Sequence, residues 1–176
     1  MTDSLVALIR GINVGRAKRV AMADLRALVE DLGFSDVRTL LNSGNVVFKG
    51  PSSVSAEAAA LIEEAIESRL GVFARVIVLT ASELTAIVRE NPLLHIADNP
   101  SRLMIAVLAN PADRIQCSTL IAQEWAPEIL ALGARVAYVW CPDGLLSSRL
   151  PAAIGRAVGD SATTRNWRTI LKIHAL

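Results

Sequence analysis

Four basic residues lie close together near the start of the chain, in a segment that contains glycine but no acidic residue. They occur in the stretch Arg-Gly-Ile-Asn-Val-Gly-Arg-Ala-Lys-Arg-Val, and they are Arg10, Arg16, Lys18 and Arg19. Cationic side chains attract anions, and glycine allows the backbone to turn and expose its N–H groups. The spacing therefore predicts a loop around Gly15 that binds phosphate, carboxylate or nucleic acid.

The glycine spacing in this loop does not match a nucleotide-binding motif. Only Gly11 and Gly15 are available and no Gly-Lys-Ser/Thr follows, so neither a Walker A motif nor G-x-G-x-x-G is present. The loop should join a buried strand to a helix, whose first N–H groups would add to the attraction for an anion. The alternative is a solvated connecting loop whose arginines pair with carboxylates from the middle of the chain.

A polar tetrapeptide, residues 42–45, is the second candidate segment. Asn42, Ser43 and Asn45 offer hydroxyl and amide groups that could assist the basic loop. Ser43 as a nucleophile would need a histidine base, and the chain has only His95 and His174. Asn and Gly tolerate the left-handed backbone angles of a hairpin, so a tight turn is the favoured interpretation.

The C-terminal segment is the third candidate. We expect Arg165 and Asn166 to form the wall opposite the loop, with Asn13 and Asn45 supplying orienting hydrogen bonds. At about 100° per residue, Trp167 falls on the apolar side of a predicted helix, and the arginines fall roughly opposite. Trp167 is therefore predicted to anchor the core. Such a pocket requires the two ends of the chain to meet.

The composition predicts a globular protein. Of 176 residues, 52% are apolar and 20% are charged, with a net charge of +1, so the chain can bury a core. No apolar run approaches the ~20 residues of a membrane helix and no basic leader is present, which predicts a cytoplasmic protein without membrane contact. Cys117 and Cys141 are predicted to be buried free thiols. The scattered His and Cys residues predict no metal site, and no cofactor is expected.

The order of the apolar patterns predicts an α/β (α+β type) fold of two units. Residues 1–80 should form a ferredoxin-like unit with strands at 5–10, 37–41, 45–49 and 75–79. Its helices should begin near Leu25 and at a Ser55 cap, and end at Gly33 and Gly71. A connector, residues 81–101, should start with the capping box Thr80 to Glu83 and stop at Asn91-Pro92.

Residues 102–176 are expected to form a second, related unit that ends in helices. The pattern predicts a strand at 103–109, a helix from Asn110, a hairpin of 129–132 and 135–141, and helices near 148–158 and 163–174. Ser147 and Ser148 are placed to cap the first of these last two helices.

Several motifs in order along the chain resemble the domain of unknown function 1697 family. They are Ala7-Leu-Ile-Arg-Gly-Ile-Asn-Val-Gly15, Met22-Ala-Asp-Leu25, Asn42-Ser-Gly-Asn-Val-Val-Phe48 and Ala162-Thr-Thr-Arg-Asn-Trp-Arg-Thr169. The resemblance implies a mostly bacterial protein with two ferredoxin-like parts, and it supplies no catalytic residues. The chain departs from the family pattern at Arg16–Lys18, where a second glycine is missing, and at Leu40, where tyrosine is common.

The sequence thus leads to one main hypothesis and leaves others open. The main one is a cytoplasmic binding protein for a small anionic or phosphate-bearing ligand, such as a nucleotide. A protein–protein or self-association module, including a homodimer, and an enzyme acting on a phosphorylated substrate are the alternatives. Base stacking on the sheet is disfavoured because its central strands offer only Phe48, which leaves contact with a nucleic-acid backbone as a secondary option.

Overall fold

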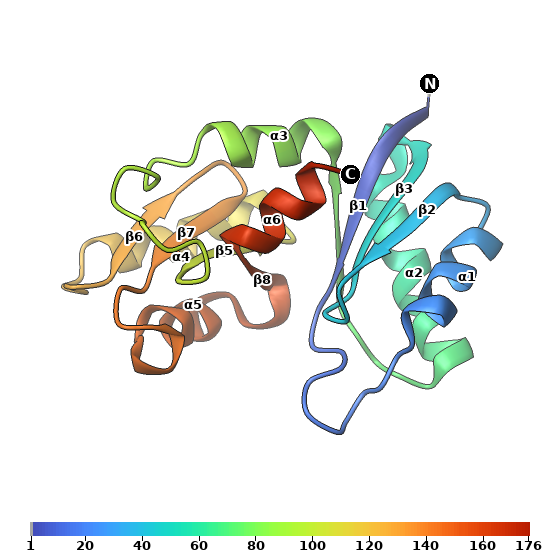
Figure 1. Ribbon diagram of the computed structural model, residues 1–176, viewed down its shortest axis with the longest axis horizontal. Helices are drawn as coiled ribbons and strands as arrows, with labels where there is room; N and C mark the ends of the chain where they lie inside the picture. Colours follow the sequence, from blue (N-terminus) through green and yellow to red (C-terminus); the bar gives the residue numbers. More distant parts are fainter. Residues whose placement is uncertain (1) are drawn as a thin grey trace. The chain divides into compact units, whose positions relative to one another are not determined.

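The computed structural model describes residues 2–176 and shows two compact units, each built around a four-stranded antiparallel sheet (Figure 1). The first unit extends to Leu84 and includes Leu176, and the second runs from Thr85 to Ala175. The predicted mixed α/β class is confirmed. None of the helices formed by the described residues has the length and apolarity that a membrane crossing requires.

The first unit has the predicted βαββαβ order. Its sheet has the strand order β2-β3-β1-β4, and each helical crossover passes over one intervening strand, as in ferredoxin-like folds. Its elements are β1 (Thr2–Ile9), α1 (Met22–Asp31), β2 (Ser35–Leu40), β3 (Asn45–Pro51), a 3-10 turn (Ser52–Val54), α2 (Ser55–Leu70) and β4 (Val76–Thr80).

The buried run of β1 explains its central position between β3 and β4. Leu5, Ala7 and Ile9 belong to the core that α1 and α2 complete, while the intervening Val6 and Leu8 are buried as well. A strand whose two faces are both buried reads as a continuous apolar run. The helices end as predicted, because Gly33 and Gly71 adopt left-handed angles just beyond α1 and α2.

The predicted cap at Ser55 is wrong. The 3-10 turn after Pro51 runs directly into α2, so Ser55 already has helical angles of φ −58° and ψ −42°. A capping residue must instead lie in extended backbone, so that its side chain can reach the N–H groups of the first turn. The capping box of α3 (Ala81–Arg89) is confirmed, since Thr80 N donates to Glu83 Oε2 at 2.8 Å and Glu83 N to Thr80 Oγ1 at 3.2 Å.

The second unit repeats the topology of the first, with strand order β6-β7-β5-β8. Asn110 Oδ1 accepts a hydrogen bond from Ala112 N and so caps a 3-10 turn, whereas the α-helix predicted from Asn110 begins only at Arg114. The elements are β5 (Leu103–Leu108), a 3-10 turn (Pro111–Asp113), α4 (Arg114–Ile121), β6 (Ile129–Leu132), β7 (Val136–Trp140), a 3-10 turn (Leu145–Ser147), α5 (Leu150–Val158), a 3-10 turn (Gly159–Ser161), β8 (Ala162–Asn166) and α6 (Trp167–His174).

The sequence prediction missed strand β8. The helix expected over 163–174 begins only at Trp167, because residues 162–166 pair with β5 and complete the second sheet. β-Branched Thr163 and Thr164 favour this extended backbone. Asn166 ends the strand and caps α6, since its Oδ1 accepts a hydrogen bond from Thr169 N at 2.9 Å. Trp167 is buried, as predicted for a core anchor.

Both cysteines are buried free thiols, as predicted. Cys117 and Cys141 belong to one apolar cluster, beneath α4 and α5 in the second unit. Burial raises the pKa of each thiol above its usual value. A raised thiol pKa reduces the thiolate fraction at neutral pH, so neither group is activated for nucleophilic chemistry.

The single tyrosine gives a spectroscopic prediction. Tyr138 is buried in β7, and its hydroxyl donates to Ile87 O at 2.8 Å. Burial raises the pKa of Tyr138 from 10 to about 12. We expect tyrosinate absorbance of the folded protein to rise with a midpoint near pH 12, and to shift toward pH 10 in denaturant. Because the unfolded chain releases this proton first, stability is lost between these two values as pH rises. A midpoint near pH 10 in the folded protein would contradict this expectation.

Candidate functional site

The basic loop joins the end of β1 to the start of α1 and extends beyond both elements (Figure 1). It contains no helix or strand. Ile12 and Val20, one near each end, are buried in the core of the first unit, and the residues between them are mostly exposed. The two apolar side chains thus hold the base of the loop in place, while its tip faces solvent.

Asn13 closes the loop with its side chain. Its Oδ1 accepts a hydrogen bond from Val20 N, and its Nδ2 donates to Val20 O, both at 2.8 Å. The same Nδ2 donates to Asn42 O at 2.8 Å, which ties the loop to the β2–β3 turn. Asn13 has a φ of 55°, a left-handed angle that Asn adopts more readily than most residues. All hydrogen-bonding groups of the amide are therefore engaged in positioning the loop.

The β2–β3 turn supports the loop from its other side. Gly44 has a φ of 86°, and its carbonyl accepts a hydrogen bond from Ile9 N at 2.8 Å. Asn45 is fully buried, and its Nδ2 donates to Leu40 O at 2.8 Å and to Ser43 Oγ at 3.0 Å. The turn interpretation of residues 42–45 is confirmed. Asn45 was expected to orient a ligand, but its burial gives it a structural place inside the turn.

The tip of the loop presents three cations without carboxylate partners. Within residues 2–176, no ion pair involves the exposed side chains of Arg16, Lys18 or Arg19. Gly15 and Lys18 adopt left-handed angles of 62° and 50°, and Lys18 O accepts a hydrogen bond from Asn13 N at 3.0 Å. The alternative in which these side chains pair with the acidic middle of the chain does not hold at this tip.

Arg10 occupies a different place from the other three bases. It lies at the base of the loop with an exposed side chain, and its backbone N–H donates to Arg75 O at 2.8 Å. Arg10 therefore continues the antiparallel pairing of β1 with the segment before β4. At the far end of the loop, Ala21 precedes α1 and provides no side-chain cap, so the first N–H groups of α1 have no side-chain acceptor from this position.

Arg165 and Asn166, which were predicted to form the wall opposite the loop, belong to the second unit. Arg165 is 7% exposed in β8, where its Nη1 donates to Thr163 Oγ1 and Thr164 O, both at 3.0 Å. Burial lowers the pKa of Arg165 to about 10, so it remains protonated at neutral pH. Asn166 is engaged as the α6 cap. Arg165 is buried because it belongs to strand β8, where the sequence predicted a helix. The pocket that Arg165 was expected to share with the loop stays a prediction.

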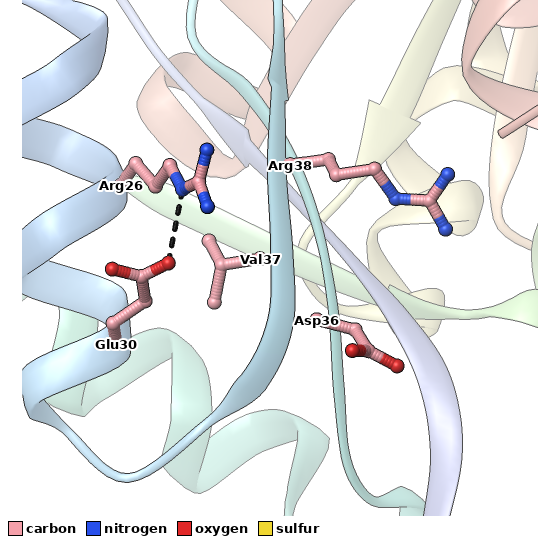
Figure 2. A pocket seen from close by; sticks show the side chains of 5 residues that line it. All are labelled: Arg26, Glu30, Asp36, Val37 and Arg38. Atoms are coloured by element: carbon pink, nitrogen blue, oxygen red, sulfur yellow. Dashed lines mark hydrogen bonds and ion pairs between the residues drawn. The ribbon is translucent and has the colours of Figure 1, made fainter.

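A separate groove lies between α1 and the edge strand β2, and none of the site residues predicted from the sequence lines it. It has a volume of about 550 Å³ and is lined by Arg26, Glu30, Asp36, Val37 and Arg38 (Figure 2). Arg26 Nε contacts Glu30 Oε1 at 2.9 Å, and Asp36 Oδ2 contacts Lys49 Nζ at 2.8 Å. The hydrogen bond from Lys49 lowers the pKa of Asp36. Most charges of the groove are thus neutralised locally, unlike those of the loop tip.

The ion pair of Arg26 with Glu30 could have been found from the sequence, because the two residues have the i,i+4 spacing of a helical pair. The ion pair of Asp36 with Lys49 depends on the register of β2 and β3 and has no local signal in the sequence. In the part of the chain that the structure describes, no three His, Cys, Asp or Glu side chains gather in a way that could hold a metal ion.

Comparison with known proteins gives the fold and the family. The solved structure of conserved bacterial protein SP0830 from Streptococcus pneumoniae is similar, with a TM-score of 0.77 and 22% identity, over 99% of this chain and 98% of that one. At this identity the likeness shows a shared fold. No curated protein matches the sequence. Residues 1–138 match the family described as protein of unknown function (DUF1697), and the chain therefore belongs to this family, as its motifs predict.

Proposed function

We propose that this protein binds a small phosphate-bearing anion through the tip of the β1–α1 loop. The observation that carries the proposal is the group of Arg16, Lys18 and Arg19, three exposed cations without a carboxylate partner among the described residues. A phosphate has several acceptor oxygens, and arginine can bind two of them at once. Nucleotides and sugar phosphates carry such phosphate groups and are therefore suitable ligands for the three cations.

The loop is suited to binding because contacts within the first unit hold its base. The Asn13 amide joins both sides of the loop and the β2–β3 turn, and Ile12 and Val20 fix its base in the core. A preorganised loop loses less conformational entropy on binding than a mobile one. Since nucleotides and sugar phosphates are abundant in the cytoplasm, we place the protein there as part of the same proposal.

The proposal predicts salt-sensitive stabilisation by phosphorylated compounds. We expect pyrophosphate, a nucleoside triphosphate or a sugar bisphosphate to raise the melting temperature at low ionic strength, and the shift to shrink as salt screens the exposed charges. Replacing Arg16, Lys18 and Arg19 together with Gln removes three exposed interactions of up to about 1 kcal/mol each, so affinity by calorimetry should fall by about tenfold to a hundredfold.

The matched control changes the same number of exposed cations elsewhere on the first unit. Arg26, Arg38 and Lys49, replaced together with Gln, remove as much positive charge from the groove of Figure 2 and from its ion pairs. Binding should survive in this control. Equal loss in both triple variants would reduce the effect to net charge, and unchanged binding in the loop variant would overturn the proposal. A short single-stranded RNA in the same panel tests contact with a nucleic-acid backbone.

A further inference from the structure

The outer edge of β6 in the second unit is an uncharged strand edge. Strand β6 is the last in the order β6-β7-β5-β8, so no strand formed by residues 2–176 pairs with its outer side. Its sequence is Ile-Leu-Ala-Leu, without a charged residue, proline or register shift. Proteins usually protect such edges with charges, proline or bulges, because an open edge can pair with another chain.

Strand β2, the equivalent edge of the first unit, carries this protection. Its pairing with β3 shifts register between Ser35 and Arg38, and Asp36 has a φ of 50°. Asp36 and Arg38 are charged and exposed, and Lys49 pairs with Asp36. One topology therefore occurs twice in the chain, with a protected edge in the first unit and an unprotected edge in the second.

The backbone of β6 presents donors and acceptors at this edge. Gly133 N donates to Val136 O at 2.8 Å, and hydrogen-bonded pairs alternate along an antiparallel ladder. Ile129 and Ala131 consequently bond to β7. The N–H and C=O groups of Leu130 and Leu132 point toward the open edge.

From this edge we infer that the second unit associates with a second copy of the chain by antiparallel β6–β6 pairing. In a two-fold arrangement that keeps the helix-covered faces on one side, Ala131 lies opposite Ala131 of the other copy. Leu130 of each copy then lies opposite Leu132 of the other, where the outward backbone groups exchange hydrogen bonds. This register pairs all the outward groups of the strand and forms one continuous eight-stranded sheet.

Charge and apolar exposure around the strand favour a second copy as the occupant. Exposed Arg114 lies at the β6–β7 turn, where its Nε donates to Gly133 O, while the exposed Glu124 precedes β6. Antiparallel pairing brings Glu124, before one strand, toward Arg114 at the end of the other. Ile121, the last residue of α4, is 52% exposed, and α4 is the helix that packs on β6.

The register can be tested by charge complementation at Ala131. Sedimentation of the full chain over a micromolar to millimolar series should show a reversible dimer. Ala131→Lys and Ala131→Glu each place like charges opposite one another, so each variant should weaken self-association by about tenfold or more. Mixing the two variants should restore dimers that contain one copy of each.

Controls separate the interface from folding. Thr39→Lys and Thr39→Glu make the corresponding changes on the protected strand β2 and should leave association unchanged. Fluorescence of the three tryptophans, all in the second unit, verifies that each Ala131 variant is folded. A wild-type chain that stays monomeric throughout the series overturns the inference, as does a mixture of folded Lys and Glu variants that forms no heterodimer.

Discussion

Gly44→Ala should lower the free energy of unfolding by about 2–5 kcal/mol, because two separate costs fall on one methyl group. A Cβ at this position would lie 2.8 Å from Ile9 Cβ and 2.8 Å from Ile12 Cδ1, both in the buried core. The φ of 86° is also strained for any residue with a side chain. Ile9 Cβ is fixed by its strand, so the turn itself must move. Chemical denaturation followed by circular dichroism measures the cost, since no tryptophan lies in the first unit.

Gly71→Ala is the matched control for backbone strain. Gly71 has a similar φ of 68° at the end of α2, and no atom would lie within 4 Å of an added Cβ. We expect this control to cost only about 1–2 kcal/mol, the strain contribution alone. The difference between the two variants gives the cost of the contacts with Ile9 and Ile12. Equal costs would mean that the turn moves away from β1 freely and does not support the loop.

Local sequence signals predicted the elements of this fold where the interactions that define them are also local. The Thr80–Glu83 capping box lies within four residues, and Gly33 and Gly71 end their helices through their own backbone angles. Strand β8 escaped this kind of prediction because its sequence, Ala-Thr-Thr-Arg-Asn, lacks the apolar alternation that marks a strand. Its pairing with β5, more than fifty residues earlier in the chain, decides its conformation.

In the candidate site, too, the features set by local sequence could be predicted and those set by distant contacts could not. Sequence identified the cations of the β1–α1 loop, because a cluster of bases with no acid among them is visible in one stretch of residues. The role of Asn13 could not be read in the same way, since its amide closes the loop by reaching Val20 and Asn42. Burial of Arg165 depended on recognising β8. Side-chain type could be predicted, but the partners that hold each side chain come from the tertiary fold.

The start of α5 depends on a carboxylate that is distant in sequence. Arg149 precedes this helix and provides no side-chain cap, and Ser148 Oγ, expected to cap it, donates instead to Gly144 O at 2.8 Å. Glu128 supplies the acceptor: its Oε1 accepts from Arg149 N and its Oε2 from Leu150 N, both at 2.8 Å. A carboxylate at a helix N-terminus is stabilised by both N–H groups and by the helix dipole.

Glu128→Ala should therefore lower the free energy of unfolding of the second unit by about 3 kcal/mol, since Glu128 is 8% exposed and Leu150 N would remain buried without an acceptor. Glu128→Gln retains one acceptor oxygen and should cost about half as much. Tryptophan fluorescence during denaturation measures both, because Trp125 lies 5.4 Å from the Arg149 guanidinium. Exchange of the Arg149 and Leu150 amides should accelerate in Glu128→Ala, whereas the exposed Glu90→Ala should change stability by less than about 0.5 kcal/mol. Unchanged exchange at these two amides would show that α5 begins independently of Glu128.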